Sequence, residues 1–251
     1  MQCASPPPKT HTALLRQRAS SGAADGAEQD KAQATLAEIF PETAVDGAAT
    51  AFALAHLRPG AGPVLWIQDR LSLRETGRPC LAGICGTAGP HTQGPHTQGL
   101  HTQGPHLLHL TVSRAADVLW AMEEGLRCPS LGAVIGEVWG NAGALDFTAT
   151  KRLALRSEAH GVPAWLIRRA ATPDLSAARE RWRLASLPSL PQPHDMRAPG
   201  LPLWRADLFR ARWRTPGQWV ARHGDDGRGL VLEHGLQQTP GNMAAQQRAA
   251  G

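Results

Sequence analysis

Long hydrophobic runs are absent from this sequence, which argues against a membrane-spanning helix. The best candidate, Ala51 to Leu57, is far shorter than the roughly 18 apolar residues that a span requires, and it contains His56. Residues 1–18 carry proline and charge where a secretory signal has an apolar stretch. We therefore expect a cytoplasmic protein that makes no membrane contact.

Metal-ligand spacings and nucleophile motifs are also missing. The four cysteines lie 77, 5 and 43 residues apart, which fits neither a zinc ribbon nor a thioredoxin-type pair, and the histidines form no HExxH motif. No GxSxG sequence marks a catalytic serine. The sequence therefore predicts no catalytic residue, no bound metal and no cofactor.

The composition is that of a globular protein with unevenly distributed charge. The chain has 251 residues, 42% of them hydrophobic, which is enough for one or two domains and too apolar for wholesale disorder. The net charge is +5, and residues 151–214 carry 13 basic and 5 acidic side chains, whereas residues 1–150 carry 10 and 13. Such a basic segment is typical of a surface that faces an acidic partner or nucleic acid.

The first 170 residues divide into an arm and a core. Residues 1–34 are rich in Pro, Ser, Ala and Gly without apolar periodicity, which predicts a mobile arm. Residues 35–170 alternate apolar runs (36–40, 64–68, 107–112, 131–138, 162–168) with helical stretches (47–57, 115–128, 147–160). This alternation predicts an α/β fold with a mainly parallel sheet flanked by helices. We expect Asp146 or Thr148 to cap the last helix and Gly161 to end it.

Residues 171–235 change to the alternation typical of antiparallel strands. The alternation occurs in four runs, at 181–186, 203–214, 219–223 and 229–233. Turn sequences separate the last three runs, which therefore predict a β meander. Five prolines between residues 188 and 202 predict a loop, and residues 236–251 predict a frayed tail.

A tandem GPHTQ repeat fills residues 89–106 and spaces its histidines five residues apart. In an extended chain, successive imidazoles would stand roughly 15 Å apart, too far to share one metal ion. We interpret the repeat as an expansion in a surface loop, where added length costs little closure entropy.

The loop after the first predicted strand lies where a nucleotide-binding α/β protein holds phosphate. A P-loop needs Gly-Lys-Ser/Thr, but this chain has no Gly-Lys pair. Glu42, Asp46 and Gly47 occupy the loop instead, and the Asp46 carboxylate would repel phosphate. Glu137 takes the place of the magnesium-binding acid in such folds, and we interpret it as a vestige or a structural hydrogen-bond acceptor. The sequence predicts a degenerate site without ATPase activity.

The predicted meander combines aromatic and guanidinium groups. Such groups suit single-stranded nucleic acid, and the same residue types anchor protein interfaces. A third interpretation is a pair of strands with tryptophans inward and arginines in solvent. Arg168 and Arg169, together with residues 179–183, could enlarge the same basic surface. The candidate partner or DNA contacts are Arg205, Arg210, Arg212, Trp213, Arg214 and Trp219.

Segments from LAEIF at residue 36 to LFRARWRTPGQWV at residue 208 resemble the ImuA family of damage-inducible mutagenesis proteins. The resemblance is most specific over residues 115–169 and 176–189, which contain LWAMEEGLRC and RWRLASLPS. It implies a fold similar to the RecA core, with residues 36–40 as the strand before the degenerate P-loop and residues 131–137 as the strand of the second nucleotide motif. The histidine-rich repeat enlarges the connection between the second and third core strands.

The resemblance implies an accessory role in error-prone bypass of damaged DNA during the SOS response. Family members act with ImuB, a polymerase-like protein without polymerase activity, and with an error-prone DnaE-type polymerase, and ImuB links them to the sliding clamp. On this basis we expect a non-catalytic adaptor whose carboxy-terminal part contacts ImuB. The alternatives are a RecA-like ATP-binding protein and a single-stranded DNA-binding module.

Overall fold

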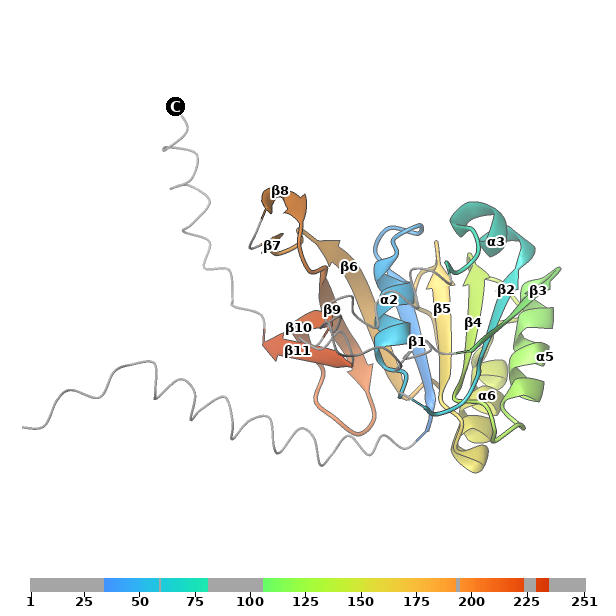
Figure 1. Cartoon of the computed structure of the whole chain (residues 1–251). Helices are drawn as coiled ribbons and strands as arrows, with labels where there is room; N and C mark the ends of the chain where they lie inside the picture. The colour runs from blue at the N-terminus through green and yellow to red at the C-terminus, as the bar shows by residue number, and fades with distance from the viewer. Residues whose placement is uncertain (1–33, 59, 81–105, 193–194, 224–228, 235–251) are drawn as a thin grey trace, which may run out of the picture. The chain divides into compact units, whose positions relative to one another are not determined.

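A computed structural model describes residues 34–58, 60–80, 106–192, 195–223 and 229–234 (Figure 1). The expectations for the arm, for nearly all of the repeat and for the tail lie outside these residues. The elements, in chain order, are β1 (Leu36–Pro41), α2 (Ala48–Ala55), β2 (Val64–Asp69), α3 (Arg70–Thr76), β3 (Leu107–Val112), α5 (Ala115–Gly125), β4 (Ala133–Trp139), α6 (Phe147–His160), β5 (Ala164–Arg169), β6 (Glu180–Leu187), β7 (Pro191–Gln192), β8 (Asp195–Pro199), β9 (Leu203–Ala211), β10 (Gly217–His223) and β11 (Leu230–His234).

One nine-stranded sheet organises the described residues, in the order β11-β10-β9-β6-β1-β5-β4-β2-β3. Strands β6, β1, β5, β4, β2 and β3 pair in parallel, and β9, β10 and β11 add antiparallel. The predicted fold class, a mainly parallel sheet flanked by helices with an antiparallel meander, is confirmed. The meander joins the same sheet through β6, so the sheet crosses the predicted boundary at residue 170.

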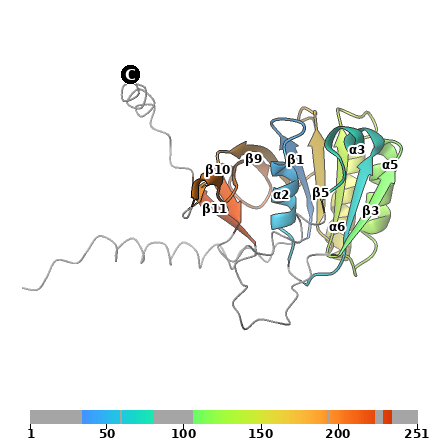
Figure 2. The ribbon, with the colours of Figure 1, turned by 45° about the horizontal axis from the view of Figure 1, so that its top comes forward.

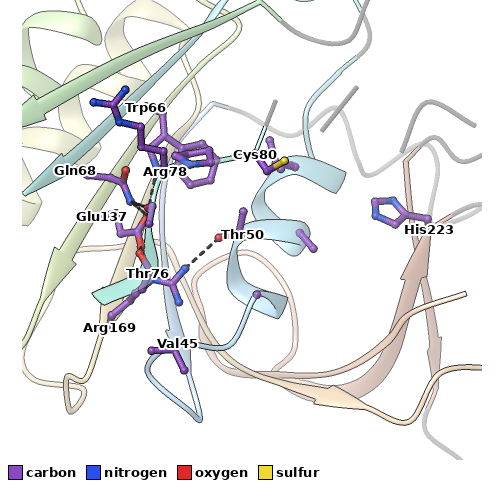
Figure 3. Close-up of a pocket in the computed structure, with 15 residues that line it drawn as sticks. Val45, Thr50, Trp66, Gln68, Thr76, Arg78, Cys80, Glu137, Arg169 and His223 are labelled. Carbon is purple, nitrogen blue, oxygen red and sulfur yellow. Dashed lines mark hydrogen bonds and ion pairs between the residues drawn. The ribbon is translucent and has the colours of Figure 1, made fainter. Parts of the chain in front are cut away.

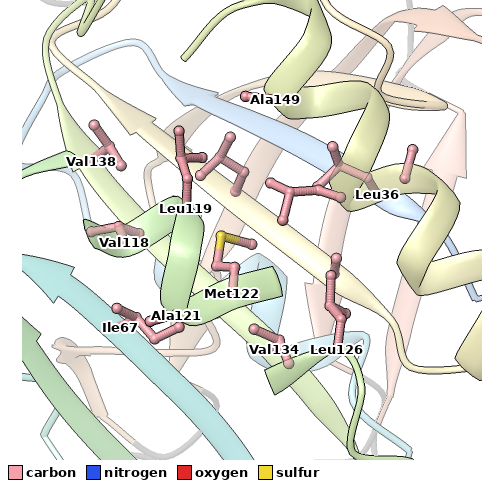
Figure 4. Close-up of a cluster of buried hydrophobic side chains, with 14 of the residues drawn as sticks. Leu36, Ile67, Val118, Leu119, Ala121, Met122, Leu126, Val134, Val138 and Ala149 are labelled. Atoms are coloured by element: carbon pink, nitrogen blue, oxygen red, sulfur yellow. The ribbon is translucent and has the colours of Figure 1, made fainter. Parts of the chain in front are cut away.

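Helices cover both faces of the sheet, and each face has its own apolar core (Figures 1 and 2). Helices α5 and α6 cover one face, where Met122 and Leu153 join buried residues of the central strands (Figure 4). Helix α2 covers the opposite face, where Phe52 packs on Trp182 with ring centroids 4.9 Å apart. Buried strands with cores on both sides explain the continuous apolar runs in the sequence.

Glycines stand where helix α5 packs against the sheet. A Cβ added to Gly136 on β4 would lie 2.2 Å from Sδ of Met122, and one added to Gly125 would lie 2.6 Å from Cδ2 of Leu65. A side chain at either position would overlap its neighbours, and a close-packed interior accommodates such overlaps only at a cost in stability. Glycine is therefore favoured at both positions.

The cap residues of α6 follow from its sequence. The Asp146 carboxylate accepts a 2.7 Å hydrogen bond from the amide of Ala149, and Gly161 ends the helix in the left-handed conformation at φ 69°. Both predictions are confirmed, with Asp146 rather than Thr148 as the cap.

Two stretches are more regular than their sequences indicated. The proline-rich stretch 188–202, predicted as a loop, contains the short strand pair β7 and β8. Residues 70–76 form α3, whose first turn is capped by the Asp69 carboxylate through a 2.6 Å bond from the amide of Ser72. Within the described ranges, no helix has the length and apolar character needed to cross a membrane.

Trp182 allows a test of the packing on the α2 face. It is fully buried, so we expect Trp182→Ala to lower the free energy of unfolding by about 3–5 kcal/mol, as in other core truncations of large aromatics. Trp213→Ala, at a site that is 51% exposed, should change it by no more than about 0.5 kcal/mol. Urea unfolding measures both, and equal losses would contradict this account of the core.

Candidate functional site

The candidate site lies at the carboxyl ends of parallel strands, where open α/β sheets bind ligands. The loop 42–47 leaves β1 and enters α2, next to the ends of β2, β4 and β5. A cavity of about 290 Å³ opens there (Figure 3). Its walls come from α2, from β2, from residues 76–80, and from Glu137, Arg169 and His223.

Arg169 fills the centre of this site and is almost completely buried. Its Nη1 donates to the carbonyl oxygens of Ala44 at 2.8 Å and Asp46 at 3.0 Å, and its Nη2 donates to Oγ1 of Thr50 at 3.0 Å. Its Nε donates to Oε1 of Glu137. One guanidinium therefore joins the loop 42–47, α2 and β4.

These contacts give the loop the opposite polarity to a phosphate cradle. A P-loop turns backbone amides toward an anion. Here the carbonyls of Ala44 and Asp46 turn toward a cation that belongs to the chain. The carbonyl groups of the loop are thus matched by a cation of the chain itself and offer no amide donors to an anion at this point.

Asp46 supplies an internal anion beside α2. Its carboxylate accepts hydrogen bonds from the amide of Ala48 at 2.8 Å, from the amide of Ser186 at 2.8 Å and from the hydroxyl of Ser186 at 2.6 Å. Burial opposes its ionisation, but the bonds from Ser186 and Ala48 and the charge of Arg169 outweigh burial and lower its pKa. The carboxylate thus occupies the anion position at the start of α2 and ties the loop to β6.

Glu137 is 1% exposed and is surrounded by donors (Figure 3). Besides Arg169, it accepts from Nε1 of Trp66 at 3.2 Å, Nε2 of Gln68 at 3.1 Å and Oγ1 of Thr76 at 3.1 Å. A carboxylate offers about four lone-pair positions, so these four donors saturate it. The side chain acts as a hydrogen-bond acceptor in this structure.

The network continues to the edge of the sheet. Nε2 of His109 on β3 lies 2.8 Å from Oε1 of Gln68. Burial and the charge of Arg78 lower the pKa of His109, and Glu137 offsets part of that shift. A neutral imidazole therefore ends the chain of hydrogen bonds that starts at Arg169.

A second buried ionic cluster lies on the opposite face of the sheet. Glu38 on β1 accepts a 2.7 Å bond from Nε of Arg181 and lies 3.5 Å from Arg168. Arg168 also donates at 3.1 Å to Asp174. The suggestion that Arg168, Arg169 and Arg181 enlarge a basic surface is wrong, because all three are buried.

Most of the basic residues in 151–214 pair with carboxylates of the same chain. Nine of the thirteen basic residues in 151–214 form ion pairs with carboxylates of the described residues. Several of these carboxylates come from the acidic first part of the chain, among them Glu38, Glu42, Glu123 and Glu137. The charge asymmetry along the sequence therefore reflects internal pairing to a large extent.

The predicted contact residues separate into two groups. Trp219 is half-buried against Trp182, 6.0 Å between centroids, and Arg205 and Arg214 pair with Glu42 and Glu180. The remaining three, which we call the exposed tip group, are Arg210, Arg212 and Trp213.

The exposed tip group lies at the end of β9 and in the connection to β10. Trp213 is 51% exposed, and the guanidinium carbons of Arg179 and Arg212 lie 5.9 and 5.8 Å from its ring centroid. Trp204, in contrast, is buried. The inward-tryptophan interpretation therefore holds for Trp204 and largely for Trp219, but not for Trp213.

Sequence reasoning missed the role of Arg169. The available signal was a pair of acids, Glu38 and Glu137, inside runs predicted to be buried, because a buried carboxylate requires a cation nearby. Among the described residues, no group of three or more His, Cys, Asp or Glu side chains is arranged to hold a metal ion. Cys80 and Cys128 are exposed free thiols.

Known proteins place the chain in a family context. It is 32% identical over 133 residues to Protein ImuA of Caulobacter vibrioides, in strain NA1000 / CB15N and equally in strain ATCC 19089 / CIP 103742 / CB 15. Over this stretch the chain is similar to ImuA proteins. The match covers 49% of the chain and 52% of each ImuA protein, so the chain spans about half the length of the curated relatives it matches.

Two further comparisons complete this context. No family model matches the chain. A solved structure of a DnaB-like replicative helicase, described with its interactions with primase, is similar at a TM-score of 0.45 and 12% identity, covering 90% of this chain and 67% of the helicase chain. The resemblance to ImuA seen in the sequence is confirmed by the first comparison.

The Arg169–Glu137 pair can be tested by a double-variant cycle. We expect Arg169→Met to lower the free energy of unfolding by about 3–5 kcal/mol, because it leaves Glu137 buried without a cation. Adding Glu137→Gln should recover part of the loss, with a coupling of about 1–3 kcal/mol. Urea unfolding provides the measurement.

Arg152→Met is the matched control, because Arg152 is 52% exposed and pairs with Glu123. It should cost no more than about 1 kcal/mol. If Arg169→Met costs the same as this control, Arg169 does not hold the site together.

Proposed function

We propose that this protein is a non-catalytic accessory protein of damage-induced mutagenesis. Its similarity to ImuA supplies the cellular context. The single observation that carries the non-catalytic part is the Asp46 carboxylate, which accepts from the amide of Ala48 at the start of α2, where a P-loop would hold phosphate. A site that contains its own cation and its own anion, Asp46, has no need of nucleotide for its structure.

The proposed partners follow from the family resemblance. We infer that the protein acts in the cytoplasm, in error-prone translesion synthesis during the SOS response. It would bind an ImuB-type polymerase-like protein and, through it, a DnaE-type polymerase and the sliding clamp. The exposed tip group supports a docking role, because exposed Trp and Arg are the residue types that carry most binding energy in protein interfaces.

Single-stranded DNA binding is the second candidate function. Trp213 favours it, because an exposed ring beside guanidinium groups can stack on a base while the cations meet phosphates. The extent of internal pairing weighs against it, since Arg205 and Arg214 would have to leave Glu42 and Glu180 to bind phosphate.

Nucleotide binding is tested by calorimetry on the full chain. With magnesium present and ATP at about 1 mM, where a site of binding energy near 4 kcal/mol would be half-filled, we expect no saturable heat. The reason is that a phosphate at the start of α2 would meet the Asp46 carboxylate, which already accepts from the amide of Ala48. A stoichiometric, magnesium-dependent isotherm would instead establish the ATP-binding alternative.

Partner binding is tested with purified ImuB and substitutions in the exposed tip group. We expect Trp213→Ala and Arg212→Glu each to weaken binding by about 30-fold, the effect of losing an interface hot spot worth about 2 kcal/mol. Phe147→Ala, at a 42% exposed site on α6, is the control and should leave affinity unchanged. Circular dichroism verifies that each variant is folded.

The DNA alternative is resolved with the same variants and a labelled single strand. Binding that falls steeply with salt and is lost in Arg212→Glu would favour the DNA-binding module, because phosphate contacts release counterions. Unchanged ImuB affinity in both tip variants would refute docking through Trp213.

A further inference from the structure

Within the part of the chain that the structure describes, strand β3 forms one edge of the sheet. It pairs with β2 through six consecutive residues without a bulge and has no strand on its other side among the described residues. Its sequence, LLHLTV, contains no proline and no Lys, Arg, Asp or Glu. Soluble proteins normally blunt such an edge with charge, proline, a bulge or a short length, because free backbone groups there invite another strand.

The edge also presents an apolar row. Val112 packs with the α5-side core and Leu107 with the opposite core, so alternation places Leu108 and Leu110 on the α5 side. Leu108 is 52% exposed and Leu110 is 39% exposed. Helix α5 lies beside β3 in both ribbon views (Figures 1 and 2). It nevertheless leaves the two leucines partly exposed.

We propose that β3 pairs antiparallel with β3 of a second copy of this chain, making one sheet across a twofold axis. Antiparallel pairing about an axis normal to the sheet sets residues of the same face opposite each other. The Leu108–Leu110 row of one copy therefore meets the same row of the other. Cross-strand apolar pairs of this kind stabilise sheets.

Charge favours a second copy as the occupant. A strand without ionised side chains meets itself without repulsion, as an isologous interface requires. Helix α5 follows β3 on the same face, so the two α5 helices would run antiparallel. Arg114, which pairs with Asp117 at the start of α5 and has 78% of its side chain exposed, would lie toward Glu124 of the other α5, which pairs with Arg127. The opposite edge, β11, differs because it carries the charged Glu233.

The test is the molar mass of the full chain by light scattering during size exclusion, over a range of concentrations. We expect twice the chain mass of 26.8 kDa for the wild-type protein. Leu110→Lys should raise the dimer dissociation constant at least about tenfold, because a lysine would face its own copy or an apolar neighbour in the pair. Leu108→Glu is the second variant, and circular dichroism confirms that both are folded.

Leu155→Lys, at a 50% exposed leucine on α6, is the matched control and should remain dimeric. A wild-type protein that is monomeric at the highest concentration overturns the proposal. So does a dimer that survives both β3 variants, which would mean that another segment of the chain makes the contact. If the protein is monomeric and β3 pairs only with a strand of ImuB, the dimer proposal is overturned. The proposed accessory function would then still stand.

Discussion

Two consecutive arginines at the end of β5 organise the centre of this protein. Side chains alternate along a strand, so Arg168 and Arg169 point to opposite faces of the sheet. Each meets a buried carboxylate of another strand, Glu38 on β1 for Arg168 and Glu137 on β4 for Arg169. Removing a partner from a buried ion pair leaves an unmatched charge, which is far more costly than a surface pair. Arg169 joins the loop after β1 to β4, and Arg168 joins β1 to the segment after β5 through Glu38 and Asp174.

Contacts within the chain hold the loop that follows β1. In a P-loop protein, the backbone amides of such a loop hold bound phosphate instead. Here Arg169 holds the loop carbonyls and Glu137, while Asp46 holds the amide of Ala48. The loop is thus held by side chains of the chain itself. The cavity that remains beside them is lined largely by α2 and the segment after α3.

The fold was largely predictable from the sequence, whereas the interior of the site was not. Short apolar runs predicted the parallel strands because a strand buried on both faces has few polar positions. The caps of α6 were predictable because Asp146 and Gly161 act on adjacent backbone. The role of Arg169 depends on residues more than 100 positions away, such as Ala44 and Thr50, and no local pattern reports that contact. Likewise, residue type alone could not separate the buried Trp204 from the exposed Trp213.

The hydrogen bonds between Asp46 and Ser186 have a consequence for dissecting the molecule. Strand β6 is both the neighbour of β1 and the anchor of the loop that follows β1. A fragment that stops after β5 would uncover one whole side of β1 and release that anchor at once. The carboxy-terminal strands are therefore part of the same folded unit as the parallel strands. Their contribution to function has to be mapped by single substitutions rather than by deletion.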